Sequence, residues 1–437
     1  MEEVFIPITM FAGLTVVVSL FFWFKYRARS DMQATIRTAI DKGQELSPEI
    51  IDRLGHPRRQ KDQDLRLALI WLAVKALIIA ALPLAYVTLS KDPHKHRKLA
   101  WVTAFLTLDL VMFGSFTRLT DSGLGCPDWP GCYGHSNPLS AGEPIRAAET
   151  ALPSGPVTMT KAWIEMLHRY FAMAVGFLII VLTAIAWRRW RREPGRSPLV
   201  ATAALAAVCV QGAFGALTVT MKLQPAIVTM HLLGGVGMLA LLTWLALREG
   251  AASPVGRGAA MLRPLAVTSA VLLVMQIALG GWVSTNYAVL ACPDFPLCHG
   301  RLMPADMDFA AGFTLWRDLG MTADGTPISF PALVAIHWVH RSFAYLVLVA
   351  LGLLAWRLWR VEGLTRLARA LAAVSAVQFL TGLSNVVLNW PLLLAVLHNG
   401  GAAVLIALLV AINYRLGTRR DAASAGLIAA APVRGGG

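Results

Sequence analysis

Long apolar segments constrain the fold of this 437-residue chain more than any other feature of its sequence. A run of about 20 apolar residues is long enough to cross a bilayer as a helix. Such segments occur at residues 4–24, 67–89, 99–118, 163–187, 199–221, 226–247, 264–286, 332–356, 370–389 and 391–413. The chain is 56% hydrophobic and only 15% charged, with a mean hydropathy of +0.59, which argues against a soluble domain. The sequence therefore predicts an all-α integral membrane protein.

The net charge of +14 is explained by membrane topology rather than by a nucleic-acid partner. Basic residues gather in alternate connections between the apolar segments, at 188–196, 248–263, 357–369 and 414–420. Cytoplasmic loops carry such an excess of Lys and Arg. The opposite loops, 119–162 and 287–331, are therefore predicted on the extracytoplasmic side of a bacterial inner membrane. Segment 4–24 lacks the small-residue cleavage site of a signal peptide.

Four of the five cysteines occur in two copies of one heptapeptide, CPDWPGC and CPDFPLC. Both copies lie in predicted extracytoplasmic loops, where disulfides persist. Each is a candidate disulfide loop or redox-active thiol pair, and the pairs are Cys126 with Cys132 and Cys292 with Cys298. A zinc site and reduced structural thiols are the alternatives, although each pair lacks the closer spacing typical of zinc ligands. The fifth cysteine, Cys209, is expected to pack inside a helix.

The heptapeptides belong to a larger internal duplication. Polar landmarks recur in the same order and with nearly the same offset along the chain: the two cysteine pairs, Gln211 with Gln378, His231 with His398, and His168 with His340. Each copy contains four apolar segments. An even number of spans places both copies the same way up, related by an axis along the membrane normal. We therefore predict two tandem four-helix bundles with eight core spans.

The predicted domain boundaries follow from this duplication. The first repeat covers residues 99–250 and the second covers 251–420. A membrane-associated N-terminal extension precedes them at 1–98, and a disordered tail follows at 421–437.

Segment 67–89 is an exception among the apolar segments. If it spanned the membrane after 4–24, the next helix would start outside and the topology of the repeats would invert. Lys75, Pro83 and basic runs on both sides also argue against a span. We expect a re-entrant or tightly kinked hairpin, or an interfacial helix, preceded by a polar cytoplasmic stretch at 30–66.

Histidines inside membrane-spanning segments are costly and are therefore functional candidates. His168 and His231 lie at matched depth on two helices of the first repeat. The second repeat has the same arrangement with His340 and His398. Facing imidazoles across a four-helix bundle are natural axial ligands for a heme iron, although a single buried histidine can equally serve helix packing. His337 shares a helix face with His340, but the repeat register selects His340 as the ligand.

The two repeats differ beside these histidines, because the first has Glu165 where the second has His337. A buried carboxylate one turn from a heme ligand can exchange protons or stabilise positive charge on a substrate, or it can simply pair with Arg169. Arg169 and Arg341 directly follow two of the histidines. Together with Arg118 they are candidates for binding anionic heme propionates. The alternative for Arg118 is a side chain that reaches the membrane interface.

These motifs resemble those of the heme A synthase family. The resemblance covers about residues 99–415 and rests on GSFTRLTDSGLGCPDWPGCYG at 114–134, E-x-x-H-R at 165–169, H-R at 340–341 and the single histidines of the fourth and eighth core helices. It implies an eight-helix oxidoreductase that oxidises the C8 methyl group of heme O to a formyl group. The product, heme A, would serve cytochrome oxidase assembly.

The resemblance also implies roles for individual residues. His340 and His398 would hold a heme b cofactor in the second repeat. His168 and His231 would flank the substrate heme O, with Glu165 beside the methyl group. The first cysteine pair would be the family's disulfide-forming pair, and the second its counterpart. Heme O synthase as substrate donor and an unidentified electron-transfer partner are implied within the lipid bilayer, and a homo-oligomer is left open.

Two other functions remain open at this point. A diheme membrane electron-transfer cytochrome would explain four histidines but not Glu165. A membrane thiol–disulfide oxidoreductase would explain the cysteines but not the histidines. One departure from the family pattern is His337, which adds a second candidate ligand beside His340.

Overall fold

The computed structural model describes residues 61–429 apart from 154, 196, 251–254 and 257, with the backbone alone at 61–69 and 418–429. The contacts within the chain divide it into two units, and the boundary lies after Arg66. Apart from the first residues of α3, all the described helices belong to the second unit, Leu67–Gly437. Every regular element in this described part is a helix. The elements are α3 (Lys61–Leu89), α4 (Lys95–Leu119), α5 (Gly142–Ala151), α6 (Met159–Arg192), α7 (Leu199–Thr220), α8 (Pro225–Arg248), η1 (Ala259–Leu262), α9 (Arg263–Thr285), α10 (Phe309–Gly312), α11 (Phe330–Trp359), α12 (Thr365–Val387) and α13 (Leu392–Ala429).

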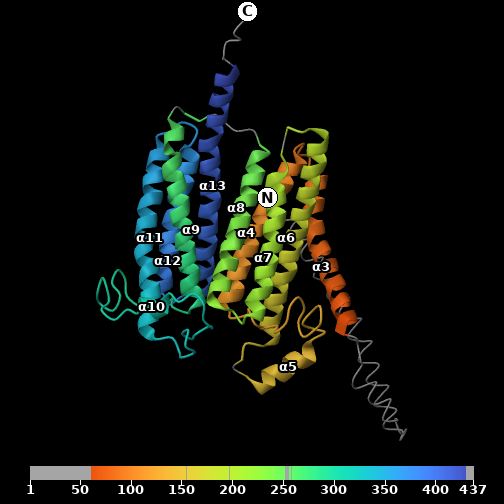
Figure 1. Ribbon diagram of the computed structural model, residues 1–437, viewed down its shortest axis with the longest axis vertical. Helices are drawn as coiled ribbons and strands as arrows, with labels where there is room; N and C mark the ends of the chain where they lie inside the picture. Colours follow the sequence, from red (N-terminus) through yellow and green to blue (C-terminus); the bar gives the residue numbers. More distant parts are fainter. Residues whose placement is uncertain (1–60, 154, 196, 251–254, 257, 430–437) are drawn as a thin grey trace, which may run out of the picture. The chain divides into compact units, whose positions relative to one another are not determined.

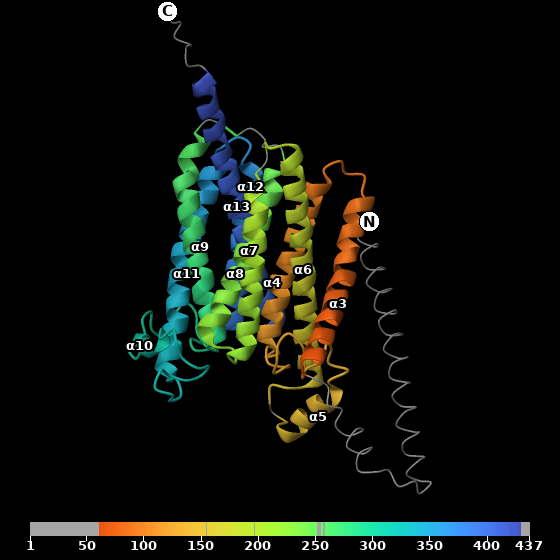
Figure 2. The same ribbon diagram turned by 45° about the vertical axis from the view of Figure 1, so that its right-hand side comes forward.

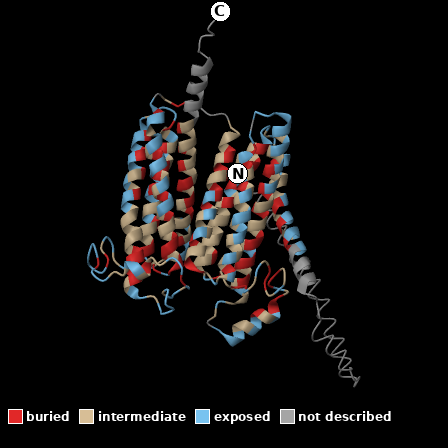
Figure 3. Ribbon diagram, viewed as in Figure 1, coloured by how far each residue is buried: buried red, intermediate tan, exposed pale blue. Residues whose placement is uncertain are grey.

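Nine helical segments of the described residues are long and apolar enough to cross a membrane: α3, α4, α6, α7, α8, η1 with α9, α11, α12 and α13. Exposed positions run along these helices (Figure 3). They include large apolar side chains such as Val271, Val349 and Val377. Lipid chains solvate such surfaces well, whereas water does not. The prediction of an all-α, multi-pass membrane protein is confirmed.

The long helices from α4 onward pack in two groups of four. In the first group α4, α6, α7 and α8 contact one another in chain order, and α8 returns to α4 around Leu178 and Leu242. In the second group α9, α11, α12 and α13 do the same around Leu273 and Leu409. The groups meet where α8 packs on α9 and where α13 packs on α4 and α8 (Figures 1 and 2).

The two long loops lie at the same end of the helices. Residues 120–158, with α5, connect α4 to α6, and residues 286–329, with α10, connect α9 to α11 (Figure 1). Non-glycine residues with positive φ, which are uncommon, occur in matched pairs with nearly the same offset along the chain. The pairs are Asp121 and Tyr287, Tyr133 and His299, Lys222 and Asn389, and Leu223 and Trp390. The backbone therefore turns in the same way at matched places in the two groups.

Side-chain caps set the start of two helices that carry candidate ligands. The Thr158 hydroxyl accepts a hydrogen bond of 3.2 Å from the Lys161 N–H at the start of α6. The Gln224 side chain accepts one of 2.9 Å from Ile227 at the start of α8, where Pro225 occupies the first helical position. Such caps satisfy backbone donors that a helix start leaves unpaired, so both helices begin at defined residues.

The expectation of a hairpin or an interfacial helix at 67–89 is wrong. This segment belongs to α3, one continuous helix that runs antiparallel to α4 (Figure 2). Lys75 does not oppose this arrangement, because its ammonium group donates to the Ser136 carbonyl oxygen at 2.7 Å and lies 3.3 Å from the Tyr170 hydroxyl. Val87, near the other end of α3, is buried with residues of α4 and α6. The helix therefore extends along its neighbours.

The structure describes only some of the residues in the predicted terminal segments. α13 continues to Ala429, beyond residue 421, where the sequence predicts the start of a disordered tail. The predicted span at 4–24 and most of the predicted polar stretch at 30–66 lie outside the described residues.

Candidate functional site

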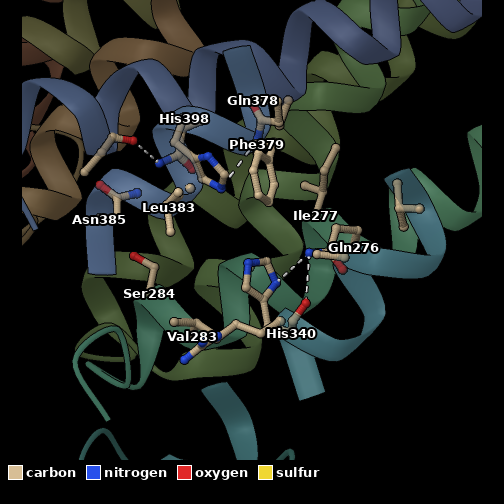
Figure 4. Close-up of a pocket in the computed structure, with 18 of the residues that line it drawn as sticks. Gln276, Ile277, Val283, Ser284, His340, Gln378, Phe379, Leu383, Asn385 and His398 are labelled. Carbon is tan, nitrogen blue, oxygen red and sulfur yellow. Dashed lines mark hydrogen bonds between the residues drawn. The ribbon is translucent and has the colours of Figure 1, made fainter. Parts of the chain in front are cut away.

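A large cavity lies in the second group of helices, between α9, α11, α12 and α13. Its atom-free space, including the open mouth, is about 1440 Å³. Apolar side chains such as Ile277, Phe379 and Leu383 dominate the lining. His340 of α11 and His398 of α13 face the cavity from opposite sides (Figure 4). The cavity can therefore take a large, apolar ligand between two imidazoles.

Neighbouring side chains hold both of these imidazoles. Nδ1 of His340 lies 3.1 Å from the amide nitrogen of Gln276, which also donates to the His340 carbonyl oxygen (Figure 4). Nδ1 of His398 lies 3.1 Å from the Thr381 hydroxyl, and its Nε2 lies 3.5 Å from the amide nitrogen of Gln378. The two rings are close enough to interact electrostatically. Each ring therefore has a polar neighbour that sets its orientation.

His168 of α6 and His231 of α8 form the corresponding pair in the first group. They too are close enough to interact electrostatically, and the Phe113 ring lies edge-on to His168 with 5.9 Å between ring centroids. Gln211 donates to the carbonyl oxygen of His231 at 2.8 Å. Nδ1 of His231, however, is buried without a hydrogen-bond partner. A buried polar atom of this kind is rare and calls for an explanation.

A glycine on a neighbouring helix faces each of the four imidazoles. A Cβ atom at Gly114, Gly215, Gly280 or Gly382 would lie 3.0, 3.3, 3.0 or 2.9 Å from a ring atom of His168, His231, His340 or His398, respectively. Any larger residue would therefore displace the ring, because protein interiors are close-packed. Our sequence reasoning missed these glycines. Their signal is present, since each glycine of the first repeat recurs in the second at the offset of the cysteine pairs or of the Gln and His landmarks.

The two heptapeptide loops are attached to the histidine-bearing helices in equivalent ways. The backbone nitrogen of Cys126 donates to Oε2 of Glu165 at 2.8 Å. The backbone nitrogen of Cys292 donates to Nδ1 of His337 at 3.2 Å. Glu165, unlike His337, also forms an ion pair, with Arg169 one turn along α6. Glu165 and His337 therefore occupy the same structural position, and each secures the first cysteine of its loop.

The arginines that follow the histidines bind the loops. The Arg169 guanidinium donates to the carbonyl oxygens of Asp128 and Gly131, at 2.9 and 2.5 Å. Arg341 makes equivalent bonds of 2.9 and 3.1 Å to two carbonyl oxygens of the second heptapeptide. The guanidinium N–H groups of both arginines therefore bond mainly to the loops, whereas we predicted from the sequence that they would bind heme propionates. Only Arg341 also borders the cavity described above.

Arg118 joins the two helix groups at the loop end. Its guanidinium donates to the Ser284 carbonyl oxygen at 2.8 Å, pairs with Asp121 at 3.2 Å and lies 4.2 Å from the centroid of the Tyr287 ring. Tyr287 in turn donates to Asp121 at 2.7 Å. Arg118 is therefore part of a polar contact between the groups, and not a side chain that simply reaches the membrane interface.

Both heptapeptides are closed by disulfide bonds. The S–S distance is 2.10 Å for Cys126–Cys132 and 2.01 Å for Cys292–Cys298. Zinc binds thiolates, so the zinc and reduced-thiol alternatives do not describe these loops. Cys209 is the free cysteine of the described residues, and it is exposed on α7 where we expected it to be packed.

The aspartate of each heptapeptide accepts hydrogen bonds from the turn that follows the loop. Asp128 accepts from the backbone nitrogens of Tyr133 and Gly134, the latter at 2.8 Å. Asp294 accepts from the corresponding nitrogens of residues 299 and 300, at 2.7 and 2.8 Å. The N–H of Gly300 is the main cause that holds the pKa of Asp294 below its ordinary value of 3.8. The loops are thus rigid independently of their disulfides.

The residues present suit heme better than a bare metal ion. The described residues contain no cluster of three or more His, Cys, Asp or Glu that could hold a metal ion. Each helix group instead offers two imidazoles from different helices, with a glycine opposite each ring. A porphyrin supplies the other ligands of its iron and needs two axial imidazoles in an apolar surrounding. The two-sided cavity of the second group is consistent with such a ligand.

Comparisons with known proteins point in the same direction. Residues 97–410 match the COX15-CtaA family, which is described as cytochrome oxidase assembly protein. Heme A synthase of Shewanella oneidensis is 38% identical over 324 residues, which cover 73% of this chain and 97% of that protein. Heme A synthase of Sphingopyxis alaskensis is 32% identical over 339 residues, covering 73% and 91%. Heme A synthase of Brucella ovis is 27% identical over 389 residues, covering 84% and 96%.

Proposed function

The chain belongs to the COX15-CtaA family of cytochrome oxidase assembly proteins, and we propose that its activity is that of a heme A synthase. It is an oxidoreductase that converts heme O to heme A. The observation that carries this proposal is a pair of imidazoles in each of two helix groups, with a carboxylate, Glu165, beside one pair only. The site with a carboxylate suits a substrate that reacts there, and the site without one suits a cofactor.

The two helix groups are tandem four-helix bundles that arose by internal duplication. Three matched features support this architecture. The helices contact one another in the same order, the positive-φ residues recur in pairs, and a glycine faces each histidine at a nearly constant offset. Both bundles carry their disulfide loop at the same end (Figure 1).

The second bundle holds heme b between His340 and His398, and the first binds the substrate heme O between His168 and His231. The cavity of the second bundle and the polar partners of its imidazoles support this allocation. A bound heme b supplies the one-electron redox chemistry that amino-acid side chains lack. The reaction site is then the bundle that carries Glu165, where the C8 methyl group becomes a formyl group.

Glu165 is placed to act on the substrate. Its carboxylate is fixed by Arg169 and by the Cys126 N–H, and it lies one helical turn before His168. A buried carboxylate held in this way can take a proton released from the methyl group or stabilise positive charge that develops on its carbon. The second bundle has His337 at the same position, so it has no carboxylate there.

The reaction implies two partners in the membrane. Heme O is apolar apart from its propionates, so we expect heme O synthase to deliver it within the bilayer. Conversion of the methyl group to a formyl group adds one oxygen atom, supplied by water, and releases four electrons and four protons. The electrons pass to an electron-transfer partner. Both proposals rest on the chemistry of the substrate and product, and a homo-oligomer is not required by either.

The disulfide loops lie on the extracytoplasmic side of the bacterial inner membrane, and α3, which begins at the same end of the helices (Figure 1), then enters the membrane from that side. The basic connections at the opposite end of the helices support this orientation. Thr326 is exposed in the second loop, and Arg191 is exposed at the basic end. We expect a membrane-impermeant maleimide to label Thr326→Cys in intact spheroplasts and Arg191→Cys only after lysis. The reverse labelling pattern would contradict this orientation.

Heme extraction and chromatography test the proposed function. Protein purified from cells that make heme O should contain heme b together with heme O or heme A. His398→Ala should remove heme b, whereas His231→Ala should keep heme b and remove heme O and heme A. Two molecules of heme b per chain would instead indicate a diheme electron carrier, and a protein without heme would contradict both functions.

A further inference from the structure

His398 and His231 occupy matching positions, but their rings are held differently. Nδ1 of His398 lies 3.1 Å from the hydroxyl oxygen of Thr381, a buried side chain. The Thr381 hydroxyl donates its hydrogen to the carbonyl oxygen of Val377 at 3.0 Å. Its oxygen is therefore free to accept a hydrogen bond from Nδ1. That contact fixes the proton on Nδ1, so Nε2, which lies 3.5 Å from the Gln378 amide nitrogen, carries the lone pair that an iron would take.

His231 lacks this support. Phe214 stands in the first repeat at the position that Thr381 has in the second, and it directly precedes Gly215 as Thr381 directly precedes Gly382. A phenyl ring offers no oxygen, and Nδ1 of His231 is buried without a hydrogen-bond partner. The orientation of this ring therefore depends on packing alone.

The other pair of histidines also differs, but through a donor. The amide nitrogen of Gln276 on α9 lies 3.1 Å from Nδ1 of His340 and donates to the backbone carbonyl oxygen of the same residue, so it orients the ring without accepting a proton from Nδ1. Leu110 occupies the matching position on α4 and packs in the apolar core of the first group. A leucine side chain cannot hydrogen-bond His168. Thr381 and Gln276 of the second bundle are thus replaced by apolar residues in the first, whereas Gln378 has a polar counterpart in Gln211.

Hydrogen bonds to the second ring nitrogen decide how firmly a histidine holds a metal. Removing such a partner typically lowers metal affinity about 10–100-fold. A cofactor must stay bound through repeated reactions, whereas a substrate must enter and its product must leave. The second bundle therefore needs firmly held histidines and the first needs loosely held ones. The hydrogen bonds to the imidazole rings of the two bundles differ in the same way.

We propose that Thr381 is a positioning residue that makes the second site retain its heme. Phe214 leaves His231 of the first site less firmly held, so that this site releases its heme. The exchangeable ligand is an iron porphyrin that differs from the retained one only in its peripheral groups. This inference rests on the proposed function for the identity of the two hemes.

Substitution of Thr381 tests the retained site. Thr381→Val removes the hydroxyl at nearly constant volume, and Thr381→Ser keeps it as the matched control. Each detergent-purified protein is mixed with an excess of a heme-scavenging apoprotein, and heme b loss is followed by absorbance. We expect heme b affinity to fall about 10–100-fold in Thr381→Val, with a shifted reduction potential and low-spin signal, and to stay near wild type in Thr381→Ser.

The reciprocal substitution tests the exchanging site. Phe214→Thr introduces the hydroxyl next to His231, and we expect heme O or heme A to survive the same treatment longer than in the wild type. Equal heme b loss and equal spectra in Thr381→Val and Thr381→Ser, or unchanged heme O release in Phe214→Thr, would overturn the inference and leave the proposed function standing. A wild-type protein without heme b would overturn both.

Discussion

The carboxylate of Glu165 accepts a hydrogen bond of 2.8 Å from the backbone nitrogen of Cys126. This bond ties the first disulfide loop to the helix that carries His168. His337 makes the same contact in the second bundle through an imidazole. Fastening the loop therefore needs an acceptor but not a negative charge, and the charge of Glu165 is left for the Arg169 ion pair and for the role in the reaction that we propose.

Glu165→Gln separates these two roles. The amide keeps an oxygen for the Cys126 N–H but has no charge and no basic oxygen. We expect heme O to accumulate while heme A falls by about 100-fold or more, the usual range for loss of a positioned acid or base. Extraction and chromatography of the hemes measure this ratio directly.

The control is Glu143→Gln on α5, whose carboxylate is exposed at the same end of the helices. It should leave the ratio of heme A to heme O unchanged. The integrity of the first loop is checked in Glu165→Gln by maleimide labelling of Cys126 and Cys132, which should stay blocked. Normal heme A formation in Glu165→Gln would remove the carboxylate from the mechanism.

Glycine-to-alanine substitutions should act through the histidine that each glycine faces. The Cβ of Gly382→Ala would lie 2.9 Å from Cε1 of His398, so the ring must move away from Thr381. Overpacking of this kind costs about 1–3 kcal/mol, and we expect a roughly tenfold or greater loss of heme b affinity. Gly352→Ala on α11 is the matched control, because its Cβ would meet no atom within 4 Å. Equal heme b binding in the two variants would show that the close approach is unimportant.

The matched placement of the histidines in the two helix groups could be predicted because polar landmarks in membrane helices are few and each one recurs. The offset that pairs His168 with His340 along the chain also pairs Glu165 with His337. The structure gives the latter two the same loop contact. Patterns of spacing therefore carry information about equivalent positions even where the residue types differ.

Contacts between distant parts of the chain could not be predicted in this way. Lys75 argued against a membrane span at 67–89, but its partners Ser136 and Tyr170 come from 61 and 95 residues away. Besides Glu165, the partners of Arg169 are backbone carbonyl oxygens, whose directions depend on how the heptapeptide folds. A sequence pattern shows where a charge lies, but it does not show which carbonyl oxygen will satisfy it.

The first disulfide should stabilise the loop without being needed for heme b binding. It closes a short loop, for which the chain-entropy model gives about 2 kcal/mol. The double variant Cys126→Ser with Cys132→Ser should therefore unfold at lower temperature yet keep its heme b, because Asp128 and Arg169 still hold the loop. Thermal unfolding and heme extraction of the same preparations check this. Loss of heme b would show that the loop influences the other bundle.

A polar cluster at the opposite end of the helices makes stability depend on pH. Glu249 follows α8 and accepts from Arg189 of α6 at 2.7 Å, and it lies 3.3 Å from His96 of α4. Arg248 lines the same small cavity. Burial alone would raise the pKa of Glu249, but the hydrogen bonds of His96 and Arg189 outweigh it and lower the pKa from 4.5 to about 2.

The sign of the pH effect follows from this lowered pKa. The ionised carboxylate stabilises the folded protein fully above the unfolded-state pKa of 4.5, and this contribution is lost as the pH falls from there toward 2. Glu249→Gln should therefore unfold at lower temperature than the wild type at about pH 6, and the difference should shrink at about pH 3. Glu193→Gln, at an exposed carboxylate beside the same end of α6, should match the wild type at both values. If Glu249→Gln lowers the unfolding temperature as much at low pH as at neutral pH, the ion pair does not account for the change. Its origin would then lie in packing of the side chain, because the volume of residue 249 is nearly unchanged by protonation.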